Sequence, residues 1–172
     1  MATAGAAEPE ILVFAAAANW QSIRGVAYPA SMTDRVIGVF CCNGGLKPSR
    51  QWNPNPRNHA ANFAFLGEDV VLDSGAKPLC GTSVSTALAA GLAAKLLDFS
   101  RQPDVQSWIS KANRDKMRTK AGMSAILKEM SQKNVSENYE CVAPWKILPA
   151  QLYHERKKVR EAICTIIEKA ME

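Results

Sequence analysis

Long hydrophobic runs are missing from this sequence. The longest uninterrupted apolar segment, residues 11–18, has eight residues, whereas a membrane-spanning helix needs about 18 or more. Basic residues are missing ahead of that run, because the first one is Arg24, and a secretory signal carries positive charge before its apolar stretch. We therefore expect no membrane span and no secretory signal.

Metal-ligand and disulfide patterns are missing as well. The chain has only two histidines and five cysteines, and none of the cysteines forms a Cys-x-x-Cys pair. An odd number of cysteines without such pairs argues against both a zinc site and a disulfide framework. We expect free thiols in a reducing compartment, which favours the cytoplasm, and we expect no cofactor and no metal.

What the chain does contain is an ordinary globular composition with uneven charge. Of its 172 residues, 47% are hydrophobic and 22% are charged, as in soluble domains. Residues 101–172 carry 14 basic and 9 acidic residues, which accounts for the whole net charge of +5. Because these charges alternate in sign, they indicate solvated helix faces and not a nucleic-acid partner. The change predicts two segments, 1–101 and 102–172.

The apolar pattern predicts buried parallel strands and a buried helix. Residues 11–17 and 36–41 are short, continuously apolar runs, as in strands covered on both faces, and residues 63–72 predict one or two further short strands. Residues 84–99 form a helix that is apolar nearly all round, so we expect it to be buried on most sides. Further helices are predicted at 105–112, 116–132 and 150–171, with extended chain at 139–149.

Two polar segments adjoin these elements and could carry chemistry. Asn19 follows the first strand, and Gly81-Thr82-Ser83 precedes the long helix. Ser83 would feel the positive end of the helix dipole among free backbone N–H groups, which can stabilise an oxyanion, and Asn19 could donate to the same oxygen. The alternative is purely structural, since Ser and Thr are common helix N-caps and Asn is a common turn residue.

At these segments the sequence resembles a known family. Residues 81–91, Gly-Thr-Ser-Val-Ser-Thr-Ala-Leu-Ala-Ala-Gly, resemble the nucleophile segment of subtilisin-like serine proteases, Gly-Thr-Ser-x-Ala-Thr-Pro-x-x-Ala-Gly. Residues 11–19 resemble the strand that leads to that family's oxyanion Asn. Tyr28-Pro29, residues 36–39 and residues 62–70 are similar to its following turn and strands. The resemblance covers residues 10–101 in the family's order.

This resemblance implies a role for each matching residue. Ser83 would be the nucleophile of a serine-type endopeptidase that acts on polypeptides, and Asn19 would be the side chain of its oxyanion hole. The residues implied to bind substrate are Ala16, Ala17 and Ala18 in one wall and Tyr28 and Pro29, joined by a cis bond, at the base.

The family's catalytic Asp and His motifs have no counterpart here, because they precede the oxyanion strand. Asp34 and His59 follow in the right order, but Asp34 opens a strand and His59 lies in a Pro- and Asn-rich loop. The chain is therefore expected to be the C-terminal half of a subtilisin-like domain and inactive alone, either as a truncated gene model or as a fragment completed by another chain that supplies the missing half. The alternative is a non-catalytic binding module or pseudoenzyme derived from such a protease.

The implied fold is a partial three-layer α/β domain with a parallel sheet, followed by a helical extension over residues 102–172. Because earlier strands of the family are absent, the strand at residues 11–17 should have an unpaired edge. Ile11 and Phe14 should then be poorly covered.

Overall fold

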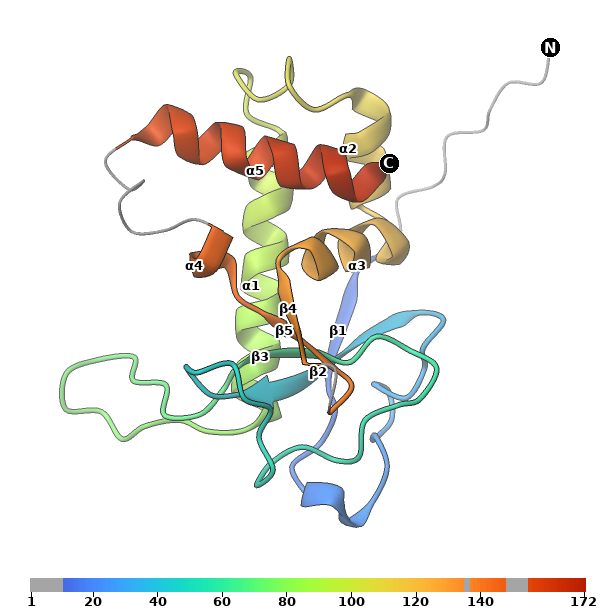
Figure 1. The fold of residues 1–172 in the computed structure, drawn as a ribbon, viewed down its shortest axis with the longest axis vertical. Coiled ribbons are helices and arrows are strands. Elements are labelled where there is room, and N and C mark those ends of the chain that lie inside the picture. Colours follow the sequence, from blue (N-terminus) through green and yellow to red (C-terminus); the bar gives the residue numbers. More distant parts are fainter. Residues whose placement is uncertain (1–10, 135–136, 148–154) are drawn as a thin grey trace.

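The structure is a computed structural model that describes residues 11–134, 137–147 and 155–172 (Figure 1). The second of the two histidines, His154, and the start of the helix expected at residues 150–171 lie outside the described residues. The elements, in chain order, are β1 (Val13–Ala16), the 3₁₀ turn η1 (Gln21–Ile23), β2 (Val36–Cys42), β3 (Phe63–Leu66), α1 (Thr82–Ser100), α2 (Lys111–Met117), α3 (Lys120–Glu129), β4 (Ser131–Asn134), β5 (Tyr139–Val142), α4 (Pro144–Ile147) and α5 (Arg156–Met171).

The five strands form one mixed sheet in the order β1-β2-β3-β5-β4. The pairs β1–β2, β2–β3 and β3–β5 are parallel, and only β4 runs antiparallel to its neighbour. β2 has a neighbouring strand on each side, and all seven of its residues are buried, as its continuous apolar run predicts. The chain thus has an α/β fold, with β1 at one edge of the sheet.

The two faces of the sheet are covered differently. On one face, Ile37, Val39 and Phe65 pack with apolar side chains from α1, α2, α3 and α5 in one core cluster. On the other face, Phe40 and Tyr139 belong to a smaller cluster that loop residues cover. The expected three-layer arrangement is therefore wrong for the described residues, because loops and not helices cover the second face.

Helix α1 is buried along one side only. Its sheet-facing residues include Ser85, Ala89, Ala93 and Leu96, which are all buried, whereas Leu88 on its outer side is 41% exposed. The expectation that this helix is buried on most sides is wrong. Its apolar outer surface has no neighbour in the described part of the chain that removes it from water.

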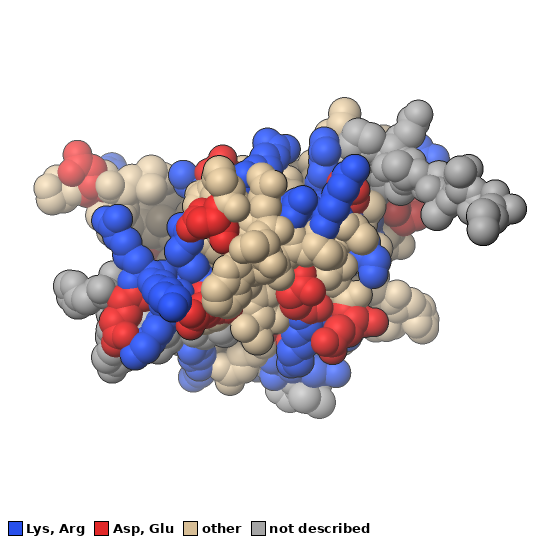
Figure 2. All heavy atoms as spheres, turned by 90° about the horizontal axis from the view of Figure 1, so that it is seen from above, with Lys and Arg blue, Asp and Glu red and all other residues tan. Residues whose placement is uncertain are grey.

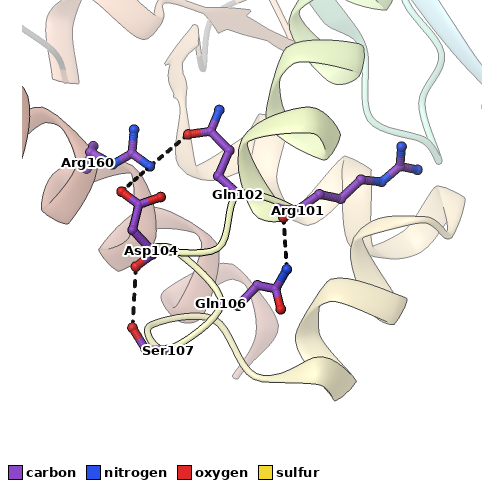
Figure 3. A network of polar contacts seen from close by, with 6 residues as sticks. All are labelled: Arg101, Gln102, Asp104, Gln106, Ser107 and Arg160. Carbon is purple, nitrogen blue, oxygen red and sulfur yellow. Dashed lines mark hydrogen bonds and ion pairs between the residues drawn. The ribbon is translucent and has the colours of Figure 1, made fainter.

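Residues 102–172 contribute strands as well as helices. β4 and β5 extend the same sheet, and buried residues of α3 and α5 belong to the main core cluster. Figure 3 shows how α5 is held to the segment after α1: the Arg160 guanidinium donates to Gln102 Oε1 at 2.7 Å and pairs with Asp104 at 2.6 Å. The helical extension expected here is therefore mixed α/β.

Charges of both signs are interspersed on the face that Figure 2 shows, as the sequence pattern predicts. Several exposed basic residues of the helices pair with acids, for example Lys169 with Glu129 and Lys158 with Glu155. No helix in the described ranges is both long enough and apolar enough to cross a membrane.

Candidate functional site

The two polar segments singled out in the sequence meet where β1 ends and α1 begins. The first residue of α1, Thr82, donates its backbone N–H to Asn19 Oδ1 at 2.8 Å and its hydroxyl to the same oxygen at 3.0 Å, across 63 residues of sequence. The structure therefore brings Asn19 to the amino end of α1, where the helix dipole is positive.

Gly81 makes this close approach possible. Its φ of +115° is a backbone conformation that favours glycine, and a Cβ at this position would lie 3.0 Å from both Nδ2 and Oδ1 of Asn19. Its N–H also donates to the Gly67 carbonyl at 2.7 Å. Two glycines therefore let the end of β3, the start of α1 and Asn19 pack against each other.

The helix N-terminus is not capped by its own serine or threonine. The N-cap residue is Gly81, which makes no side-chain cap, and the acceptor for the first N–H is Asn19, in the bend that follows β1. The buried Thr82 hydroxyl donates to Asn19, and the buried Ser85 hydroxyl donates to the Phe65 carbonyl at 3.0 Å. The structural alternative, in which Thr82 or Ser83 caps α1, is therefore wrong.

Ser83 is the exposed residue of this first turn. Among the described residues, neither its hydroxyl nor its backbone N–H has a hydrogen-bond partner, and the Nδ2 of Asn19 has no acceptor. Two N–H donors and one hydroxyl are therefore available at a helix N-terminus, which is the arrangement that binds a carbonyl oxygen or an anion.

The residues expected to bind substrate lie next to this site. Ala17 is buried, its N–H donates to the Val39 carbonyl, and its own carbonyl accepts the N–H of Ala27, each at 2.9 Å. This second bond holds the Tyr28–Pro29 turn against the segment Ala16 to Ala18. The Tyr28–Pro29 bond is cis, as predicted, while the Tyr28 side chain is 78% exposed.

Neither described candidate for a catalytic base or acid reaches the site. His59 lies just before β3, at the amino end of the strand, in a hollow of about 320 Å³ that also contains Lys128 and Lys133. Asp34 is exposed and pairs with its neighbour Arg35 at 3.5 Å. Asn19 and Ser83 lie at the carboxyl ends of the parallel strands, whereas His59 lies at the amino ends of these strands, on the opposite side of the sheet from the site.

The cysteines of β2 and of the segment before α1 differ in exposure. Burial raises the pKa of the Cys41 thiol to about 11, and contact with the Cys141 thiol, together with burial, raises the pKa of Cys42. Both are therefore neutral packing groups at pH 7. Cys80, two residues before Thr82, is exposed, and its sulfur accepts the N–H of Asp69 at 3.3 Å.

Cys80 was not among the candidate site residues expected from the sequence. Its position directly before the Gly-Thr-Ser segment is the signal that could have identified it. Within the described ranges, no three His, Cys, Asp or Glu side chains lie close enough to hold a metal ion.

Comparison with known proteins gives one informative result. The chain matches no family model and none of the curated proteins. It resembles a solved structure described as the prenylagaramide maturation protease PagA, with 25% sequence identity and a TM-score of 0.52. The match covers 73% of this chain and 42% of PagA, so the chain spans about two fifths of the length of that protease.

This result corrects the assignment made from the sequence. The solved structure described above is a maturation protease, and neither a family model nor a curated protein supports a subtilisin-like family. The assignment to subtilisin-like serine proteases and to serine endopeptidase activity is therefore withdrawn. The motifs that suggested it are short, and residues 102–172, which lay outside them, supply two strands of the sheet. What is supported is a fold shared with a protease.

Proposed function

We propose that this chain carries the carbonyl-binding part of a protease-type site at the carboxyl end of β1 and the amino end of α1. The observation that carries the proposal is the bond from the Thr82 N–H to Asn19 Oδ1. It fixes the Asn19 amide beside the first turn of α1, next to the N–H of Ser83. The similarity to a maturation protease supports a peptide as the ligand.

In this site a peptide carbonyl oxygen accepts hydrogen bonds from Asn19 Nδ2 and from the Ser83 N–H. Both donors sit at the positive end of a 19-residue helix, so they stabilise negative charge more than they stabilise a neutral carbonyl. The site therefore favours the oxyanion that forms when a carbonyl carbon is attacked.

The proposal is limited to binding. Ser83 contributes its backbone N–H as a hydrogen-bond donor. Its hydroxyl is not reached by His59, which lies at the amino end of β3, or by Asp34, which pairs with Arg35.

Two substitutions of Asn19 separate peptide binding from helix capping. Asn19→Asp keeps an oxygen acceptor for Thr82 but replaces the amide donor with a second carboxylate oxygen. We expect binding of N-acetyl tetrapeptide amides, followed by NMR titration, to weaken about tenfold or more, since one hydrogen bond is lost and a charge repulsion is added. Asn19→Leu removes both functions and should weaken binding and destabilise the fold.

The matched control is Asn58→Leu. Asn58 is exposed and lies beside His59, at the amino ends of the strands and away from the site. This substitution should leave peptide binding unchanged. Equal binding by the unmodified chain and by Asn19→Asp would show that the amide donor has no part in binding, and the proposal would fail.

A further inference from the structure

The outer edge of β1 exposes backbone hydrogen-bonding groups. β1 is the terminal strand of the sheet and pairs only with β2 among the described residues. The N–H of Ala17 donates to Val39 in β2. Because N–H direction alternates along a strand, the N–H and C=O groups of Phe14 and Ala16 point away from β2. They form an open template for another strand.

Apolar surface is exposed on both faces of this edge. Val13, which is 40% exposed, lies on the face away from α1, because side chains alternate along a strand. On the other face, a groove of about 310 Å³ runs between the β1 edge and the adjoining flank of α1, lined by Leu12, Phe14, Ala90, Ala93, Ala94 and Leu97, with Arg101 and Arg118. The alanines on α1 leave room for a neighbouring chain to approach the helix closely.

The described part of β1 has none of the usual protection of an edge strand. Proteins blunt such edges with charged side chains, proline or a bulge, whereas β1 reads Val-Phe-Ala-Ala and is regular. An apolar groove joined to an unprotected edge is typical of an interaction surface.

Two arginines in the groove indicate the charge that a partner should carry. Arg101 and Arg118 are both exposed and line the groove, and Figure 3 shows the Arg101 side chain directed away from the network that holds α5. Acidic side chains on a partner would complement these arginines. A second copy of the chain would bring the same two arginines to its own groove, so it supplies no complementary charge there.

We propose that the β1 edge and the α1 groove together bind an extended segment of another polypeptide. The segment pairs with β1 as an additional strand, places aliphatic side chains in the groove, and carries acidic side chains opposite Arg101 and Arg118. This inference does not depend on the proposed function, because its surface is the edge and outer side of β1 and α1 and not the Asn19–Ser83 site.

Two synthetic peptides test the proposal on the full chain. One has a core of alternating Val and Thr flanked by two Glu at each end, and the other has the same core flanked by Lys. We expect the Glu-flanked peptide to bind about tenfold more tightly, which is the effect of reversing two exposed charge pairs. Hydrogen exchange should then slow at the amides of Phe14 and Ala16, whose N–H groups face outward, and stay unchanged at Ala15.

Reversing the charge of the two arginines gives a test that a folding defect cannot mimic. The double variant Arg101→Glu with Arg118→Glu should bind the Lys-flanked peptide in preference to the Glu-flanked one, a gain that a misfolded chain cannot give. Ala94→Glu should abolish binding of the Glu-flanked peptide. Its matched control, Ala121→Glu on the exposed side of α3, should not.

Three results would overturn the proposal. The first is equal binding of the two peptides. The second is binding of the Glu-flanked peptide without slower exchange at Phe14 and Ala16. The third is a stable dimer of the chain alone, seen by light scattering after size exclusion, that Ala94→Glu converts to a monomer, because the surface would then be an interface between two copies.

Discussion

At the scale of single residues, Asn19 has two separate functions in one side chain. Its oxygen takes the first N–H and the first hydroxyl of α1, which stabilises the helix start, and its nitrogen is available for a ligand. Capping contacts of this kind contribute about 0.5–2 kcal/mol. Capping by a side chain from another element also fixes the position of α1 relative to β1, which a local serine cap would not do.

Asn19 variants should therefore differ in stability. Asn19→Leu should lower the free energy of unfolding by about 1–2 kcal/mol, because the Thr82 N–H and the buried Thr82 hydroxyl lose their acceptor. Asn19→Asp should match the unmodified chain or exceed it by up to about 1 kcal/mol, since it places a negative charge at the helix N-terminus. Urea unfolding measures both. Equal losses for the two variants would contradict the capping role.

Ser83 should be chemically unreactive in the isolated chain. Without a neighbouring base its hydroxyl stays protonated and weakly nucleophilic, so a fluorophosphonate probe should not label it. Intact-mass spectrometry after exposure to the probe measures this, with Ser83→Ala as the control. Rapid stoichiometric labelling that Ser83→Ala removes would show that a base is present after all.

At the scale of elements, the glycines that join β3 to α1 determine whether the site forms. Gly81 combines a positive φ with a direct approach to Asn19, and a Cβ on Gly67 would lie only 2.0 Å from the buried Ser85 hydroxyl oxygen. These positions are backbone requirements of the tertiary contact. The sequence motif identifies the residues but not the reason for them.

Gly81→Ala should therefore disrupt the site more than an ordinary loop substitution. Alanine at a φ of +115° is strained by about 1–3 kcal/mol, and its Cβ would crowd the Asn19 amide. We expect a lower melting temperature and loss of peptide binding. Gly44→Ala is the matched control, because a Cβ there meets nothing within 4 Å. Equal effects of the two variants would contradict this account.

Buried ionisable groups on β2 and β5 should make the fold sensitive to alkaline pH. Burial raises the pKa of Cys41 from 9.0 to about 11 and that of Tyr139 from 10.0 to about 12. Above pH 9 the unfolded chain therefore releases protons that the folded chain retains, so stability falls as pH rises. For Cys41 alone the loss between pH 9 and 11 is about 2 kcal/mol. In urea unfolding over this range, Cys41→Ala should show a shallower decline, and an unchanged slope would contradict the assignment.

Parts of these elements could be predicted from the sequence. Continuous apolar runs correctly predict that residues 13–16 and 36–42 contain strands, but only β2 is buried on both faces as such a run implies. The prediction of a helix at residues 105–112 is wrong, because the next helix after α1 is α2, which covers Lys111–Met117. The polar strand β4 was not predicted. Its residues have no apolar pattern of their own, and they form a strand because they pair antiparallel with β5. The Asn19–Thr82 contact was predictable only through a motif, since 63 residues separate its partners.

At the scale of the whole molecule, the helices of residues 102–172 complete the core on one face of the sheet. Ile167 of α5, Leu127 of α3 and Phe65 of β3 belong to the same buried cluster. The division into segments 1–101 and 102–172, which the charge distribution suggests, stays a prediction. The shared core leads us to expect that the two segments unfold together.

Ile167→Ala tests this cooperativity. Removing a fully buried isoleucine should lower the free energy of unfolding by about 2–5 kcal/mol. Because one core joins α5 to the sheet, hydrogen-exchange protection should decrease in β2 as well as in α5. Thr165→Ala, at an exposed position of α5, is the control. A loss of protection confined to α5 would show that the two segments unfold separately.

The central claim is that Asn19 and Ser83 together bind a peptide carbonyl, and side-chain NMR tests it most directly. On ¹⁵N-labelled chain, addition of an N-acetyl tetrapeptide amide should shift the Asn19 Nδ2 resonance and the Ser83 backbone N–H resonance downfield together, with one shared dissociation constant. The signals of Asn58 and His59 should not move. Shifts at His59 without shifts at Asn19 and Ser83, or no saturable shift at either donor, would contradict the account.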